Sequence, residues 1–455
     1  MLKVSNQIFN FSLSQHFWFP FFFISLRLIP STAELSYFLV AGYALLGRQQ
    51  IIESLFLVWL FSMLNPEIIP YAKYESFSRY IVVLACLFSI LIRANFKKID
   101  KLCSITILLG IFFIFHSIFF SHLPLLSIMK ATYWILIMVI LILSWQGMSF
   151  SLHENTIDWI TAFLFISILI SLVLFQYFPE IGFTINNTYF QGILNHPQAM
   201  GLAAASLTIL LIYQLDTKNK NNFLLFIKII IAISLLLLSG SRTAVLAIVL
   251  SMFISVLLFS IYKLLKGRLL VKFHMNKFYI LGGLFLLILM IIFQEKIFNL
   301  ILVFVNKTYT LDIGNLLSAY KKSRSVLYDP MIDNISKNFY DGIGFGLASD
   351  LSSMNIKYFK GIPVSAPTEK GILPLAILEE VGVYGLIIFT LWVLMLISLA
   401  LKKGFRSLLV LLTILIFNFG ESGFFSPNGF GMLYLILITS VVTGHHKFIT
   451  SKTVF

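Results

Sequence analysis

The sequence has few charged residues. Asp, Glu, Lys and Arg together make up 11% of its 455 residues, against about 25% in an average soluble protein. Hydrophobic residues make up 59%, and apolar stretches recur along almost the whole length. So apolar a surface would aggregate in water, whereas about 20 apolar residues cross a bilayer as a helix. Helices are required there, because lipid offers the backbone no hydrogen-bond partners. The sequence therefore predicts an all-α polytopic membrane protein.

Cysteine and internal repeats are also scarce. The two cysteines, Cys86 and Cys103, lie in or beside apolar segments, so we expect neither a disulfide framework nor a cysteine-based metal site. No repeat is evident, which disfavours a transporter built from inverted repeats. Near the N-terminus, Lys3 alone would form the positively charged region of a signal peptide. No small-residue cleavage site follows the apolar stretch 8–29. We therefore expect this stretch to be the first membrane segment and not a cleaved signal peptide.

The apolar stretches predict about 12–14 transmembrane helices. The second and third are short, and a single re-entrant hairpin would also account for them. The expected spans are 9–30, 33–47, 50–66, 79–95, 103–121, 128–145, 157–178, 195–214, 223–240, 243–264, 277–294, 371–400, 405–420 and 429–444.

Positive charge, a net +14, collects in short loops that all fall on one side of these spans. The clusters are Arg93, Lys97, Lys98 and Lys101; Lys218 and Lys220; Lys263, Lys266, Arg268, Lys272 and Lys277; Lys402, Lys403 and Arg406; and Lys447 and Lys452. By the positive-inside rule that side is the cytoplasm, and both termini are cytoplasmic. This placement explains the basic composition without nucleic acid as a partner.

Four regions follow from this topology. N-terminal helices occupy 1–190, and core helices with the polar motifs described below occupy 191–294. The only sizeable polar stretch, 295–370, mixes charges of both signs, so we expect an ordered extracytoplasmic loop. C-terminal helices occupy 371–455.

Arg242 lies between two apolar runs, in a tight turn on the outer side. Its guanidinium suits a phosphate-bearing ligand, because its planar fork matches phosphate oxygens; structural capping or contact with lipid headgroups is the alternative. His196 and Gln198 open a span on the same side, where Pro197 fits the first helical turn and the free amides favour an anion. His196 is a candidate base or hydrogen-bonding residue, although a lone histidine is more often structural. The small residues from Gly201 onward indicate close helix packing.

A basic cluster, Lys321, Lys322 and Arg324, lies in the long loop. It is a candidate binding surface for an anion or simply a solvated face. The glycines of 342–346 suggest a tight backbone turn, since without a strand–helix context they do not indicate a nucleotide site.

Glu379 and Glu380 lie inside the apolar span that follows. Buried carboxylates are costly in a membrane, so at least one should pair or line a polar cavity. Glu380 is a candidate partner for an outer arginine, in a structural or a catalytic role. His116, within another span, is expected to be a buried structural histidine.

Several motifs occur in a familiar order. They read HPQAMG at 196–201, LLLLSGSRTAVLAIVL at 235–250, SRSVL at 323–327, GIGFG at 342–346 and LEEVGVYGL at 378–386. Over about 190–390 the chain therefore resembles the superfamily of O-antigen ligases and Wzy-type polysaccharide polymerases.

The resemblance implies a membrane-embedded, GT-C-like glycosyltransferase. Its donor would be an undecaprenyl-diphosphate-linked oligosaccharide, used without a metal or other cofactor on the outer face of the bacterial inner membrane. Arg242 and Arg324 match the family arginines thought to hold the donor diphosphate. Two guanidinium groups in a dry site would stabilise the departing diphosphate. Lys321, Lys322, Lys370, His196 and Gln198 would contribute to substrate binding, and a flippase and a chain-length regulator are the expected protein partners.

One departure from the family pattern favours a polymerase over a ligase. Ligases usually carry a histidine just before the span that follows the large loop, and here 366–370 contains none. Glu369 becomes the candidate base by its position, with a structural pair to Lys370 or a loop arginine as the alternative. A ligase that transfers glycan to lipid or protein, and a membrane transporter, remain the other two hypotheses.

Overall fold

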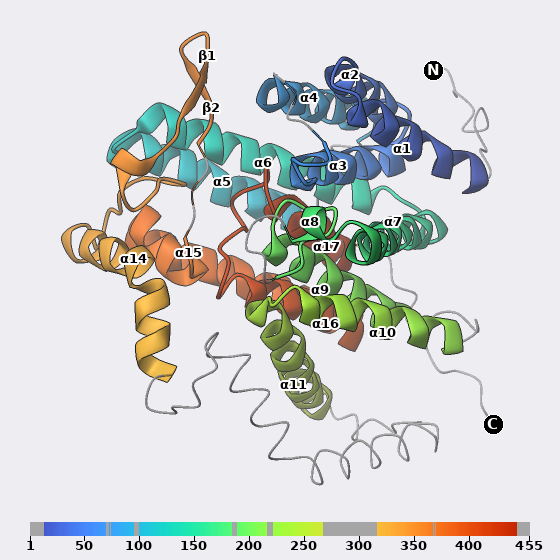
Figure 1. Ribbon diagram of the computed structural model, residues 1–455. Coiled ribbons are helices and arrows are strands. Elements are labelled where there is room, and N and C mark those ends of the chain that lie inside the picture. Colours follow the sequence, from blue (N-terminus) through green and yellow to red (C-terminus); the bar gives the residue numbers. More distant parts are fainter. Residues whose placement is uncertain are drawn as a thin grey trace, which may run out of the picture.

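The computed structural model (Figure 1) describes residues 13–443 apart from 70–71, 73, 95–99, 184–188, 216–221, 267–315, 367 and 369. Its helices are α1 (Leu13–Leu28), α2 (Ala33–Ala44), α3 (Arg48–Met63), α4 (Glu75–Arg93), α5 (Lys101–Phe120), α6 (Pro124–Gln146), α7 (Phe150–Tyr177), α8 (Pro179–Gly182), α9 (Pro197–Gln214), α10 (Asn222–Leu238), α11 (Arg242–Leu265), α14 (Leu316–Lys337), α15 (Leu373–Lys403), α16 (Phe405–Phe417) and α17 (Gly431–Thr443). Every expected span coincides with one of these helices, except 277–294, which lies outside the described residues.

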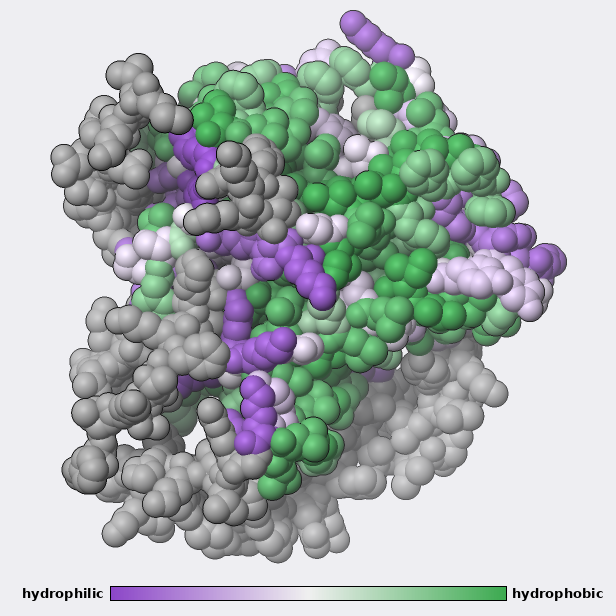
Figure 2. Space-filling view, turned by 180° about the vertical axis from the view of Figure 1, so that it is seen from behind, coloured by the Kyte–Doolittle hydropathy of each residue, from purple (hydrophilic) through white to green (hydrophobic). Residues whose placement is uncertain are grey.

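The surface of this helical assembly is broadly apolar, and Figure 2 shows wide areas of hydrophobic side chains on the face turned toward the viewer. Large apolar residues such as Leu265, Phe223, Trp18 and Phe119 are more than 70% exposed. Within the described part of the chain, six helices are long and apolar enough to cross a membrane: α4, α5, α6, α7, α11 and α15. These features are those of a polytopic membrane protein.

The described basic clusters gather at one end of the helices, named here the basic end. Arg93, which ends α4, donates hydrogen bonds to the carbonyl oxygens of Leu45 and Leu46 in the turn between α2 and α3. Gln146, which ends α6, binds Asp100 at the start of α5. A ring contact joins the last turns of α11 to the start of α16. The alternation of basic loops in the sequence therefore corresponds to one end of the structure.

The other ends of the same helices meet in a second group of loops, named here the opposite end. The amide of Asn65, just after α3, donates to the carbonyl of Ile193 at 2.8 Å, and the amide of Asn195 donates to Met63 at 2.8 Å. The first residue of α15 donates to the carbonyl of Asn418, which follows α16. The starts of α9 and α15 therefore lie at this end together with the ends of α3 and α16.

Helices α2 and α3 run between the same two ends as α4. Their connecting turn binds Arg93 at the basic end, whereas Glu34 at the start of α2 accepts from the amide of Tyr74, next to the start of α4. Two antiparallel helices therefore make up this region. The protein surrounds helix α3, and 13 of its 16 residues are buried.

The long loop is ordered over its described part. It contains α14, a short 3₁₀ turn at Leu351–Ser353 and the antiparallel strands β1 (Lys357–Phe359) and β2 (Ile362–Ser365). The strands form a hairpin that projects from the helices (Figure 1), and Phe359 stacks on Phe77 of α4 at 4.6 Å. Hydrogen bonds from Ser352 lower the pKa of the Asp350 carboxyl, which caps the 3₁₀ turn. The all-α expectation is therefore corrected by one small hairpin.

Helix α15 is broken near the opposite end. Val381 and Gly382 leave the helical conformation, with φ of −128° and +64°. The carbonyls of Glu379 and Glu380 instead accept hydrogen bonds from the amides of Ile343 and Gly344, each at 2.9 Å. These bonds satisfy backbone groups that lipid would leave unpaired. The break in α15 and the loop at 339–346 therefore depend on each other.

Glycine makes this contact possible. Gly342, Gly344 and Gly346 all have positive φ, as expected for the tight turn at 342–346. A Cβ on Gly342 would overlap the backbone of Glu380, and a Cβ on Gly382 would overlap the carbonyl oxygen of Tyr340. The two backbones approach closely because neither carries a side chain at these points.

We predict that Gly382→Ala lowers the free energy of unfolding by about 1–3 kcal/mol or more, because alanine is strained at this φ and meets the Tyr340 carbonyl. Thermal unfolding of the purified protein in detergent measures the loss. Gly42→Ala is the matched control, since Gly42 lies in α2 with open space around it, and it should be neutral or slightly stabilising. Equal stability of the two variants would contradict the proposed constraint.

Candidate functional site

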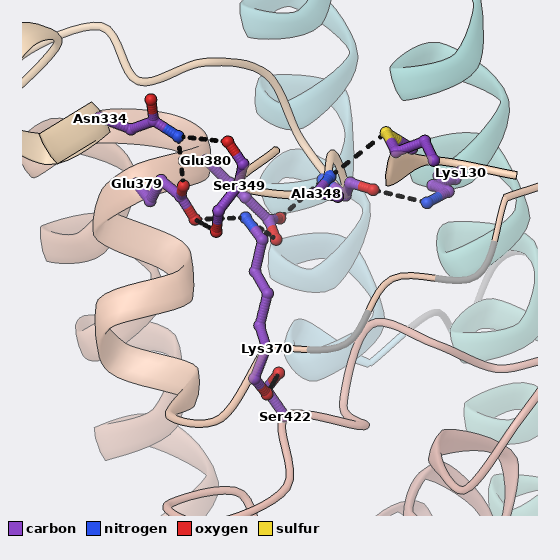
Figure 3. A network of polar contacts seen from close by, with 10 residues as sticks. Lys130, Asn334, Ala348, Ser349, Lys370, Glu379, Glu380 and Ser422 are labelled. Atoms are coloured by element: carbon purple, nitrogen blue, oxygen red, sulfur yellow. Dashed lines mark hydrogen bonds and ion pairs between the residues drawn. The ribbon is translucent and has the colours of Figure 1, made fainter. Parts of the chain in front are cut away.

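One lysine and two glutamate side chains meet at the break in α15 (Figure 3). Lys370, from the segment before the helix, places its Nζ 2.6 Å from Glu379 Oε2 and 3.1 Å from Glu380 Oε1. All three residues are buried. The expectation that at least one glutamate pairs is confirmed, and the ion partner that the structure shows is a lysine instead of an arginine.

Both carboxylates have further donors. Glu379 accepts from Asn334 Nδ2 at 2.7 Å and from Ser349 Oγ at 3.0 Å. Glu380 Oε2 accepts from the amide of Gly346 at 2.6 Å. One lysine cannot neutralise two buried carboxylates, so these neutral donors offset part of the remaining desolvation cost. The charged cluster thus ties together α14, the 342–350 segment and α15.

A cavity of about 550 Å³ lies next to this cluster. It opens among the ends of α3, the starts of α4, α6 and α15, the base of the β1–β2 hairpin and the loop after α16. The cavity therefore belongs to the opposite end of the molecule, away from the basic end. Its apolar wall includes Met63, Leu126, Met129, Leu373 and Phe430.

Positive charge exceeds negative charge among the described residues that line the cavity. The lining cations are Arg79, Lys130, Lys357 and Lys370, and the lining carboxylates are Glu380 and Glu421. This excess favours an anionic ligand, and the apolar wall suits one that is also partly hydrophobic.

The residues predicted at the start of α9 lie beside this cavity. The amide of Gln198 donates to His196 Nδ1 at 3.1 Å, so His196 caps the helix. Gln198 Nε2 donates to Glu421 Oε1 at 2.5 Å and thereby holds a carboxylate of the cavity wall. His196 therefore caps α9. Gln198 positions the Glu421 carboxylate by a hydrogen bond.

Arg242 begins α11 near the same loops but is not among the residues that line the cavity. Its neighbours pack closely: Ser241 on Gly201 of α9, and Thr243 on Gly420. The close packing expected of the small residues in α9 is thereby confirmed.

The other predicted loop residues are placed only in part. Lys321, Lys322 and Arg324 belong to α14, but their side chains are outside the described part of the structure. Glu369 also lies outside the described residues. A pairing of Arg242 with Arg324 around one ligand therefore stays a prediction.

Sequence reasoning missed Arg79, Lys130 and Lys357. The first two lie within the opening turns of α4 and α6 at the opposite end, where the positive-inside rule disfavours cations. Arg242, which the sequence places on the outer side, is an exception of the same kind, so the rule could have singled out Arg79 and Lys130 as well. Lys357 had no such signal, because only the hairpin brings it to the cavity.

His116 lies outside the cavity, as expected of a structural histidine. It is buried in α5, and its Nε2 lies 2.5 Å from the carbonyl oxygen of Asp341. This bond anchors the glycine-containing turn to α5.

No family model matches the chain, and no curated protein matches it.

We predict that Lys370→Met lowers the free energy of unfolding by about 3–5 kcal/mol, because it leaves two buried carboxylates without their cation. Adding Glu379→Gln and Glu380→Gln should recover much of the loss by removing the unpaired charges. Thermal unfolding in detergent compares the variants. Lys337→Met, which breaks the exposed pair with Asp333, is the control and should cost less than about 1 kcal/mol. A single Lys370→Met variant as stable as this control would contradict the assignment.

Proposed function

We propose that this protein is a polysaccharide polymerase that joins undecaprenyl-diphosphate-linked repeat units on the outer face of the bacterial inner membrane. The observation that carries the proposal is the cavity at the opposite end, where an excess of cations, two carboxylates and an apolar wall surround one space. A lipid-linked glycan diphosphate has matching parts: an anionic diphosphate, sugar hydroxyls and a hydrocarbon chain. The motif resemblance between 196 and 386 points to the same class of reaction.

The proposed orientation places the basic end in the cytoplasm. The cavity then opens on the extracytoplasmic side, where lipid-linked repeat units arrive after a flippase has moved them across the membrane. A chain-length regulator would be a second protein partner.

The proposed chemistry is displacement at the anomeric carbon. A hydroxyl oxygen of the acceptor sugar forms the new glycosidic bond, the bond between the donor sugar and its diphosphate breaks, and the diphosphate leaves with the bond electrons. A carboxylate takes the hydroxyl proton, and Glu369 and Glu380 are the candidates. By the motif resemblance, Arg242 and Arg324 are proposed to stabilise the charge of the departing diphosphate, with Arg242 reaching it from the loops next to the cavity and not from the described lining.

A second function, transport, is favoured by one observation. Broken helices with charged residues at the break are a feature of secondary transporters, and α15 breaks directly after Glu379 and Glu380. Here, however, both carboxylates pair with Lys370, and the break is near one end of the helix. A ligase differs from a polymerase only in its acceptor, so the product distinguishes these two.

We predict that Arg242→Ala and Arg324→Ala each abolish the polymer in a strain that lacks the chromosomal copy. Arg→Lys at either position should also be poor, because a point charge does not reproduce the guanidinium fork. The measurement is the glycan ladder on a gel, with membrane levels of each variant determined by immunoblot. Lys337→Ala, on the exposed part of α14, is the control and should give a normal ladder.

Normal ladders from both arginine variants would contradict the proposed role of these residues. Single repeat units that still reach the final acceptor would identify a polymerase and not a ligase.

We predict that Tyr358→Cys is labelled from outside spheroplasts by a membrane-impermeant maleimide, because Tyr358 is 62% exposed on the hairpin. Ser151→Cys, an exposed position at the basic end, should be labelled only after lysis. Both variants need Cys86→Ser and Cys103→Ser, although the native cysteines are buried. The reverse labelling pattern would invert the proposed topology.

A further inference from the structure

Arg79 and Lys130 hydrogen-bond to backbone carbonyls and form no direct ion pair among the described residues, and Glu380 interacts with Lys130 only at longer range. Arg79 donates to two backbone carbonyls, those of Asn428 at 3.1 Å and Glu75 at 3.4 Å. Lys130 donates to the carbonyl of Gly346 at 2.5 Å. Among the described residues, neither cation has a carboxylate within ion-pair distance, and the neighbouring Glu75 pairs with Arg27. Carbonyl dipoles solvate a cation but do not cancel its charge. Binding of an anion at this wall would therefore be favoured.

Tyr133 is a third polar residue of this wall. It lies one turn after Lys130 on α6, lines the cavity and is 5% exposed. Its hydroxyl is buried and makes no hydrogen bond within the described part of the chain. A buried hydroxyl without a partner costs free energy, and a phosphate oxygen would accept its hydrogen bond.

Two amide side chains also line the cavity with unused groups. Asn195 Oδ1 and Asn428 Oδ1 are buried and have no hydrogen-bond partner among the described residues. Asn428 is the residue whose backbone carbonyl holds Arg79. Amide oxygens accept hydrogen bonds from hydroxyl groups. A sugar has several hydroxyl groups, whereas a simple phosphate ester has none to match.

We propose that Arg79, Lys130 and Tyr133 form the phosphate-binding part of a subsite for a lipid-linked glycosyl diphosphate, in which Asn195 and Asn428 bind the sugar. This rests on the proposed function for the identity of the ligand, but the subsite is made of residues outside the Arg242 and Arg324 motifs. The two cations match the two negative charges of a diphosphate diester, one on each phosphoryl group. The apolar wall formed by Leu126 and Met129 accommodates the first part of the lipid chain.

Binding to the purified full-length protein in nanodiscs tests the subsite without any turnover. The probes are undecaprenyl diphosphate, undecaprenol, which has the same chain without phosphate, and inorganic diphosphate, which has the phosphates without the chain. Native mass spectrometry or quenching of tryptophan fluorescence reports the dissociation constants. The wild type should bind undecaprenyl diphosphate more tightly than either other probe.

Arg79→Gln and Lys130→Gln should each weaken undecaprenyl diphosphate binding about tenfold or more, as expected for loss of a charged hydrogen bond. Tyr133→Phe should weaken it about threefold to tenfold without loss of stability, because the hydroxyl makes no bond within the described protein. This variant keeps the test valid if either charge variant fails to fold. Lys337→Gln is the matched control and should bind as the wild type does.

Unchanged binding in Tyr133→Phe and in a folded Arg79→Gln or Lys130→Gln variant would overturn the subsite, whatever the polymer assay shows. Equal affinity for inorganic diphosphate would overturn the lipid-linked part of the assignment. The variants could lose binding as expected while the wild type makes no polymer in cells. That result would support the subsite and contradict the proposed polymerase activity. Asn195→Ala should lower affinity for a sugar-bearing lipid diphosphate but not for undecaprenyl diphosphate, and an equal effect on both would contradict its contact with sugar.

Discussion

The pairing of a broken helix with a glycine-containing turn is the constraint on which the site depends. Where α15 breaks, the carbonyls of Glu379 and Glu380 lose their helical donors, and the amides of Ile343 and Gly344 replace them. This exchange fixes the long loop against the helices at one end of the molecule. The Glu379 and Glu380 side chains, directly before the break, pair with Lys370, so the charged cluster and a wall of the cavity both adjoin this one departure from helix geometry.

The charges of the cavity divide into two kinds. Lys370 pairs with both glutamates, neutral donors bind the same carboxylates, and together they hold the loop in place. Arg79 and Lys130 bind backbone carbonyls and form no direct ion pair among the described residues. A buried side chain that forms ion pairs within the protein is best explained by a structural role. A cation without an ion pair in the cavity wall is best explained by a role in binding an anionic ligand. On this basis α4 and α6 add proposed substrate contacts to those proposed for Arg242 and Arg324, and the segment around the break in α15 forms another wall of the cavity.

Hydropathy was enough to predict the helices and their alternation. Each expected span outside 277–294 is a helix, and the described basic clusters share one end. The site was harder, because its contacts join residues far apart in the sequence. Nothing local to Lys370 indicates that it meets Glu379 and Glu380, and no periodicity places Lys130 beside Gly346. The break at Gly382 was equally hidden, since it is stable only when a distant turn supplies the missing hydrogen bonds.

The most direct test of the central claim is an experimental structure of the full chain in a nanodisc with undecaprenyl diphosphate. The account predicts that the two phosphorus atoms lie in the cavity beside α15, with oxygens within hydrogen-bond distance of Arg79 and Lys130. A headgroup bound elsewhere on the protein, with no ligand density between α4 and α6, would contradict it.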